Sequence, residues 1–144
     1  MECWQSMWTF RKQGSSVTTK QRGDAAEDLA LAHLQRHGLR LVQRNFKTPG
    51  RGGGEVDLIM REPDGTLVFV EVRQRASASR GGAAGSVTPL KQRRVVLAAR
   101  HFLLRLGSEP PCRFDVVLID GALDAPAAPA VQWLRAAFDA AGTS

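Results

Sequence analysis

Asp57, Glu71 and Arg73 are the residues whose types and spacing first indicate chemistry in this sequence. They belong to two short segments, G-E-V-D-L-I at 54–59 and V-F-V-E-V-R at 68–73, in which hydrophobic residues surround the acids. A carboxylate among hydrophobic neighbours is costly unless its pKa rises or a cation lies beside it. These three side chains are therefore the first candidates for a functional site.

The two acids are expected on the strands of a β-hairpin. Residues 55–60 and 66–74 have strand chemistry, and the turn-forming residues 61–65 separate them. One interpretation of Glu71 and Arg73 is a cross-strand set of ion pairs on a solvated face. The nearly continuous apolar run before Glu71 favours instead a central strand that is covered on both faces.

Strand alternation assigns the hairpin side chains to faces. In the first run it groups Glu55, Asp57 and Ile59 on one face and Val56, Leu58 and Met60 on the other. In the second run it groups Leu67, Phe69, Glu71 and Arg73, with Val68, Val70 and Val72 opposite.

A third acid, Glu27, lies in a helix predicted at residues 24–37, which ends before Gly38. Glu27 precedes apolar residues by three, four and seven positions, which places it on or beside the stripe that faces the core. A glutamate near a helix N-terminus can also simply stabilise the helix dipole. Arg22, just ahead of this predicted helix, is either a solvated loop residue or a contact to a phosphate.

The remaining sequence alternates strand and helix signals. A strand is predicted at 39–46, a helix at 88–106, a strand at 113–119 and a terminal helix at 131–140. The glycine-rich basic loop at 47–54 lacks the arrangement of a P-loop, and Arg51 is its candidate phosphate contact. This order predicts an α/β fold with a central mixed β-sheet flanked by helices.

The charge balance favours a polyanionic partner. The chain has 20 Lys and Arg against 14 Asp and Glu, a net charge of +6 and a pI near 10.3. The helix at 88–106 begins with a basic cluster, so Lys91, Arg93 and Arg94 are candidate contacts to nucleic-acid phosphates, as is Arg75. A solvated helix face is the alternative explanation for the cluster.

Length and composition indicate one globular domain. With 144 residues, of which 43% are hydrophobic and 24% charged, we expect a single domain at 21–144 after a flexible leader at 1–20. The aromatic residues of this leader, Trp4, Trp8 and Phe10, receive no function from the sequence.

Cysteine usage and hydropathy bear on the compartment. Cys3 and Cys112 show neither a CxxC pattern nor the spacing of a zinc site, so free thiols in a reducing cytoplasm are expected. No segment approaches the roughly 20 apolar residues that cross a bilayer, and the first residues lack the apolar region of a signal peptide. We therefore expect a cytoplasmic protein without membrane contact, with a homodimer as one option for its assembly.

Five motifs in order carry a family resemblance. They are Glu27 on its helix, G-E-V-D-L-I at 54–59, V-F-V-E-V-R at 68–73, K-Q-R-R at 91–94 and R-F-D-V-V at 113–117. From about Gly23 to the terminal helix the chain resembles the bacterial YraN family. That family is similar to the PD-(D/E)xK nuclease superfamily, which includes the archaeal Holliday junction resolvases. The resemblance implies a restriction endonuclease-like fold with its site on the central hairpin.

The resemblance also implies roles for single residues. Asp57 matches the superfamily's aspartate, Glu71 its second acid, Arg73 the position of its lysine, and Glu27 the helical glutamate of the resolvase-like branch. Mg²⁺ or Mn²⁺ would then be held by Asp57 and Glu71, with the Val72 carbonyl and Glu27 as further ligands, directly or through water.

Arg73 departs from the superfamily pattern, because an arginine stays protonated and cannot act as a general base. It could still stabilise a phosphoryl transition state through bidentate hydrogen bonds. Two functions therefore remain open. One is a Mg²⁺- or Mn²⁺-dependent nuclease that hydrolyses DNA phosphodiester bonds, with branched or flapped DNA as candidate substrates. The other is a non-catalytic nucleic-acid-binding module of the same fold, and a scaffold for a protein partner is a third, weaker alternative.

Overall fold

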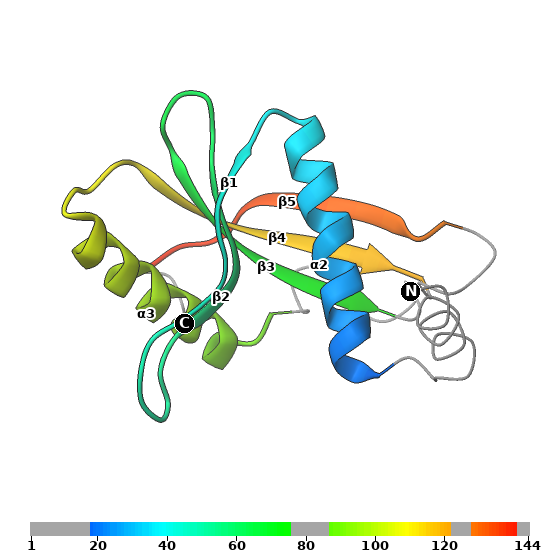
Figure 1. The fold of residues 1–144 in the computed structure, drawn as a ribbon, viewed down its shortest axis with the longest axis horizontal. Coiled ribbons are helices and arrows are strands. Elements are labelled where there is room, and N and C mark those ends of the chain that lie inside the picture. Colours follow the sequence, from blue (N-terminus) through cyan, green and yellow to red (C-terminus); the bar gives the residue numbers. More distant parts are fainter. Residues whose placement is uncertain (1–17, 76–86, 122–127, 141–144) are drawn as a thin grey trace, which may run out of the picture.

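The computed structural model describes residues 18–75, 87–121 and 128–140. These residues form one five-stranded sheet in the order β1-β2-β3-β4-β5, with two helices (Figure 1). The elements are α2 (Thr19–Arg36), β1 (Arg40–Lys47), β2 (Glu55–Arg61), β3 (Leu67–Arg75), α3 (Pro89–Leu106), β4 (Cys112–Asp120) and β5 (Ala130–Phe138). The parallel pair β3 and β4 is connected through α3, and the other neighbours are antiparallel.

Two hydrophobic clusters lie on opposite faces of the sheet, one under each helix. Ala26, Ala30 and Leu34 of α2 pack on one face, against a cluster that includes Val68 and Val70 of β3. The α3 residues Val95, Val96, Ala98 and Ala99 pack on the other face, against a cluster that includes Leu67 and Phe69. The predicted alternation along β3 is therefore confirmed, as is the α/β class, and the fold is consistent with a restriction endonuclease-like fold.

The helix α2 begins earlier than the predicted residue 24. Thr18 is its N-cap: its side-chain hydroxyl accepts a 3.1 Å hydrogen bond from the Gln21 backbone N–H, and the Gln21 side chain accepts one of 2.8 Å from the Thr18 N–H. This reciprocal capping box has a T-x-x-Q signature that the sequence displays. Arg22 consequently lies within the helix, not ahead of it.

The prediction of a terminal helix at 131–140 is wrong, because residues 130–138 form β5, antiparallel to β4. Alanine, leucine and arginine favour helices, but the free edge of β4 offers a ladder of unpaired backbone groups that a strand satisfies. Trp133, Leu134 and Phe138 pack against the core, as expected. The aromatic leader residues and Cys3 lie outside the described residues.

Strict alternation also fails in β2. Val56 belongs to the cluster under α3 together with Ile59, whereas Leu58 and Met60 belong to the cluster under α2. The change of face occurs around Asp57, and the neighbouring strand β1 has Asn45 at a φ of 51° between the partners of Leu58 and Val56. Asparagine tolerates this left-handed conformation better than most residues. The local distortion gives Asp57 its position at the boundary between the two faces.

Candidate active site

The candidate site lies where β2 and β3 separate. Their pairing ends at Leu58 and Val70; beyond this point β2 continues beside β1, and β3 continues beside β4 as far as Arg75. Figure 1 shows the two strands diverging. We call this opening the fork, and define it by Asp57 on β2 and by Glu71 and Val72 on β3.

Asp57 bridges the fork through its side chain. The Val72 backbone N–H donates a 2.8 Å hydrogen bond to Asp57 Oδ2, replacing the ladder bond that the separated strands no longer make. Burial and the negative charge of Glu71 together raise the pKa of Asp57 to about 7. The Val72 hydrogen bond and the positive charge of Lys91 oppose this rise. The two acids therefore repel each other when both are ionised.

Glu71 is only 2% exposed, and its cationic partner is Lys91 of α3. Lys91 Nζ lies 3.2 Å from Glu71 Oε2 and 3.6 Å from Glu55 Oε1, and Arg94 Nη2 lies 3.3 Å from the same Glu55 oxygen. Burial disfavours the Lys91 ammonium, but attraction to Glu71, Glu55 and Asp57 outweighs it and raises the pKa of Lys91. The sequence predicted that Lys91 contacts phosphate, whereas in this structure its ammonium pairs with Glu71 and Glu55.

Glu27 approaches the same region from α2, on the other face of the sheet. It is buried, and its Oε1 accepts a 3.4 Å hydrogen bond from Arg44 of β1. Burial and the nearby charge of Asp57 raise the pKa of Glu27, and Arg44 offsets them only in part. Asp57 thus lies within electrostatic range of an acid on each side, Glu27 and Glu71.

Gly54 lets α3 approach the start of β2 closely. A Cβ at this position would lie 2.4 Å from Ala98 N and 2.5 Å from Arg94 O, so no larger residue fits without moving backbone. The Arg94 guanidinium adds a 3.3 Å hydrogen bond to the Gly53 carbonyl oxygen. This tight contact holds the first turns of α3, and with them Lys91, against the fork.

The donor chemistry of the fork fits a hard divalent cation. Asp57 and Glu71 offer carboxylate oxygens whose mutual repulsion a dication would relieve. Within the described part of the chain, no three His, Cys, Asp or Glu side chains are grouped so that they could hold a metal together. Mg²⁺ commonly uses one or two carboxylates and completes its shell with water and substrate oxygens. Two acids therefore suffice, and a contribution from Glu27 would run through water.

Arg73 lies two residues beyond Glu71 on β3 and is partly exposed. No ion pair joins it to any other residue that the structure describes. The acid pair thus has its salt bridge from Lys91, which comes from a helix, and not from Arg73 in the strand position that the resemblance highlights.

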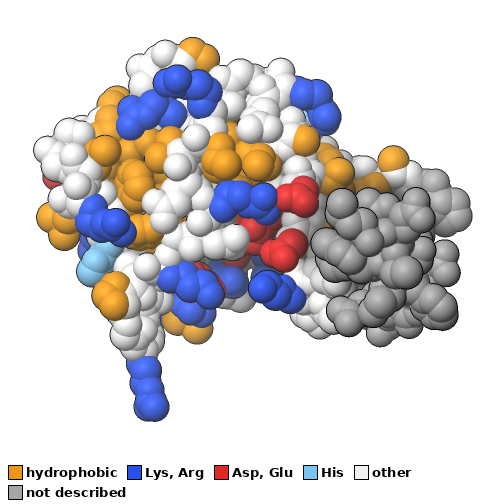
Figure 2. Space-filling model, in the orientation of Figure 1, with side chains coloured by type: hydrophobic (Ala, Val, Ile, Leu, Met, Phe, Trp, Pro, Cys, Tyr) orange, Lys and Arg blue, Asp and Glu red, His pale blue; other side chains and the backbone are white. Residues whose placement is uncertain are grey.

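The other predicted phosphate contacts differ in their surroundings. Arg75 pairs with Asp120 through hydrogen bonds of 2.7 and 3.1 Å, and Arg94 pairs with Glu55. Arg93 and Arg51 are exposed, while the side chain of Arg22 lies outside the description. Figure 2 shows a small group of acidic side chains near the centre of one face, bordered by Lys and Arg side chains.

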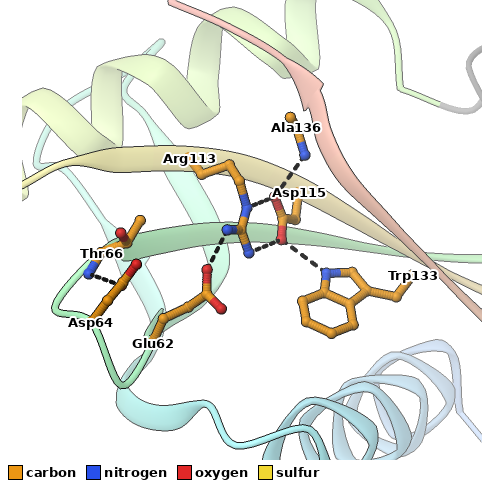
Figure 3. Close-up of polar contacts among 7 residues, drawn as sticks. All are labelled: Glu62, Asp64, Thr66, Arg113, Asp115, Trp133 and Ala136. Atoms are coloured by element: carbon orange, nitrogen blue, oxygen red, sulfur yellow. Dashed lines mark hydrogen bonds and ion pairs between the residues drawn. The ribbon is translucent and has the colours of Figure 1, made fainter.

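Asp115, in the R-F-D-V-V segment, is fully buried and has a structural role (Figure 3). Its carboxylate accepts hydrogen bonds from Arg113 at 2.9 and 3.0 Å, from Trp133 Nε1 at 2.8 Å and from the Ala136 N–H at 3.0 Å. Arg113 also pairs with Glu62 in the turn between β2 and β3. The network fixes a bulge at Ala136, whose φ is 50°, and ties β5 to β4.

Sequence reasoning missed the ion pair between Lys91 and Glu71 at the fork. The signal was present, because Lys91 precedes Val95 by four and Ala98 by seven residues and so shares the inner face of α3 with them. Arg93 lies off this stripe and is exposed.

Neither described helix is long and apolar enough to span a membrane. Cys112 is a free thiol in this structure.

Comparison with known proteins identifies the family. Residues 26–119 match the model of "Uncharacterised protein family UPF0102". A UPF0102 protein of Polaromonas naphthalenivorans is 63% identical over 152 residues, covering 93% of this chain and 99% of the relative. One of Albidiferax ferrireducens is 64% identical over 123 residues, covering 85% and 91%. The resemblance to YraN-like proteins is thereby confirmed, and the chain belongs to the UPF0102 family.

Proposed function

We propose that this protein is a metal-dependent nuclease that hydrolyses phosphodiester bonds of DNA, with a PD-(D/E)xK-type site at the fork. The observation that carries the proposal is the pair of Asp57 and Glu71, a partly buried and a buried acid on strands that separate between them. A protein does not keep two repelling carboxylates together cheaply unless a cation or a proton is to occupy the place between them. Branched and flapped DNA are the substrates that the resemblance to junction resolvases suggests.

The residues of the fork take distinct parts in this proposal. Asp57 and Glu71 would hold Mg²⁺ or Mn²⁺ together with the Val72 carbonyl, and the ion would supply Lewis-acid activation of water and phosphate. The Val72 N–H fixes the Asp57 carboxylate in orientation. Arg73 donates hydrogen bonds to the phosphate and carries no proton away, since its guanidinium stays charged. The nucleophilic water therefore loses its proton to solvent or to a nearby acid such as Glu55.

One observation favours the alternative, a module that binds nucleic acid without cutting it. Lys91 already provides a positive charge to Glu71, so the pair is partly neutralised without any metal. The basic net charge and the exposed Arg93 and Arg51 would then serve binding alone.

A single-turnover cleavage screen separates these two functions. Single-stranded, duplex, flap and four-way DNA are incubated with Mg²⁺ or Mn²⁺ and with the parent protein, Asp57→Asn, or Arg73→Ala. Asp24→Asn is the matched control, since Asp24 is an exposed acid of α2 that forms no ion pair with another described residue. The nuclease predicts product with the parent and Asp24→Asn but none with the other two variants. Binding without product in every protein supports the module, and equal cleavage by Asp57→Asn contradicts the site.

A further inference from the structure

We infer that Lys91 is an exchangeable internal cation: it holds Glu71 in the metal-free protein, yields Glu71 to a divalent cation, and then contacts a substrate phosphate. This inference rests on the proposed function and adds to it a residue that strand motifs do not reveal. It also gives one helix of the fold a direct part in coupling metal binding to DNA binding.

The first support is the position of Lys91. Its ammonium lies 3.2 Å from Glu71 Oε2, although the residue belongs to the first turn of α3. Gly54 brings that helix so close to β2 that Lys91 can reach both Glu71 and Glu55. By contrast, no ion pair links the described acids to Arg73.

The second support is the difference in burial between the two partners. The Glu71 side chain is 2% exposed, whereas that of Lys91 is 31% exposed. A buried carboxylate requires a cation, but a half-exposed lysine on a flexible stem can turn its ammonium to water without any change in the helix. Lys91 can therefore leave while Glu71 stays in place.

The third support is the balance of charge. When both carboxyl groups are ionised, Asp57 and Glu71 carry two negative charges and Lys91 supplies one positive charge, so the pair is then undercompensated without a metal. Glu55 has its own partner in Arg94. When the two acids are neutralised by a dication, the charge of Lys91 becomes surplus at the mouth of the fork. A phosphodiester group, with one negative charge, matches that surplus.

The release of Glu71 by Lys91 to a divalent cation is tested by calorimetric titration of Mn²⁺ into the parent protein and into Lys91→Met. Methionine keeps the apolar stem of the lysine side chain. Arg100→Met, on the exposed part of the same helix, carries the same change in net charge and serves as control. Lys91→Met is expected to bind Mn²⁺ at least fivefold more tightly than both other proteins. Binding by Lys91→Met alone would also support the exchange.

The failures are distinguishable. A site in the parent that is unchanged or weaker in Lys91→Met overturns the inference and leaves the metal site of the proposed function standing. No Mn²⁺ binding in any of the three proteins overturns both.

The contact of Lys91 with a substrate phosphate is tested by the salt dependence of the affinity for duplex DNA. The affinity is measured once with Ca²⁺ as the divalent cation and once with EDTA. One additional phosphate contact changes the log–log slope by about 0.9. The slopes of the parent and Lys91→Met should agree in EDTA and differ by about one contact in Ca²⁺. Because both proteins are compared in each buffer, competition of Ca²⁺ with DNA cancels. Equal slopes in Ca²⁺ would overturn the transfer of Lys91 to phosphate.

Discussion

The Val72 N–H donates its hydrogen bond to the Asp57 carboxylate across the point at which β2 and β3 stop pairing. A side chain thus satisfies a backbone donor that a neighbouring strand would otherwise satisfy. The same carboxylate lies within electrostatic range of Glu71, so the end of the ladder and the acid pair are one structural feature. Asp57 thus limits the free-energy cost of ending the β2–β3 ladder at this point.

Because of Asp57, the free energy of unfolding should fall as the pH rises. Its pKa is about 7 in the folded protein and near 3.8 when unfolded, so the folded state binds more protons between these values and loses stability as pH rises through them. Between pH 5 and 9 this amounts to about 2 to 3 kcal/mol. Urea unfolding should show a steeper decline for the parent than for Asp57→Asn, which retains an oxygen for the Val72 N–H. Parallel pH profiles would mean that Asp57 does not carry this proton.

Gly54→Ala should destabilise the protein by about 1 to 3 kcal/mol, because the added methyl group meets the backbone of α3 at Ala98 and Arg94. Gly23→Ala is the matched control. Gly23 lies inside α2, and a methyl group added there would meet nothing within 4 Å, so the same substitution should stabilise by about 0.5 to 1 kcal/mol. The urea unfolding midpoints of the two variants, compared at a constant m-value, measure both changes in stability. Opposite signs are the expected result, and two similar effects would show that α3 is free to move.

Asp115→Ala should cost about 3 to 5 kcal/mol, since it leaves Arg113 and Trp133 without their buried acceptor. Asp28→Ala removes an acid whose side chain is 66% exposed, and should cost at most about 1 kcal/mol. Thermal unfolding compares the two variants with the parent. A small loss of stability in Asp115→Ala would contradict the structural role of Asp115 and would make it a candidate functional residue again.

Local sequence signals located most of the elements. The apolar run of β3 and the Thr88–Pro89 start and Gly107 end of α3 were readable because strand burial, capping and left-handed glycine act within a few residues. The start of α2 was also readable from Thr18 and Gln21, although the prediction placed it later.

The features that could not be read depend on contacts between distant segments. The strand β5 exists because β4 has a free edge and Asp115 binds the Ala136 N–H, and neither condition is visible within residues 130–138. The change of face at Asp57 depends on its pairing with β1 beside Asn45. Periodicity could bring Asp57 and Glu71 to a hairpin, but not show that the hairpin opens between them.

The most direct test of the acid pair is Mn²⁺ titration of the parent against Asp57→Asn and Glu71→Gln. Each substitution removes one anionic ligand while keeping size and hydrogen-bonding capacity, so each variant should bind Mn²⁺ at least tenfold more weakly. Asp24→Asn, at an exposed acid of α2, should bind like the parent, which excludes a general effect of net charge. A parent site whose affinity is unchanged in both fork variants would contradict the claim that Asp57 and Glu71 hold a divalent cation.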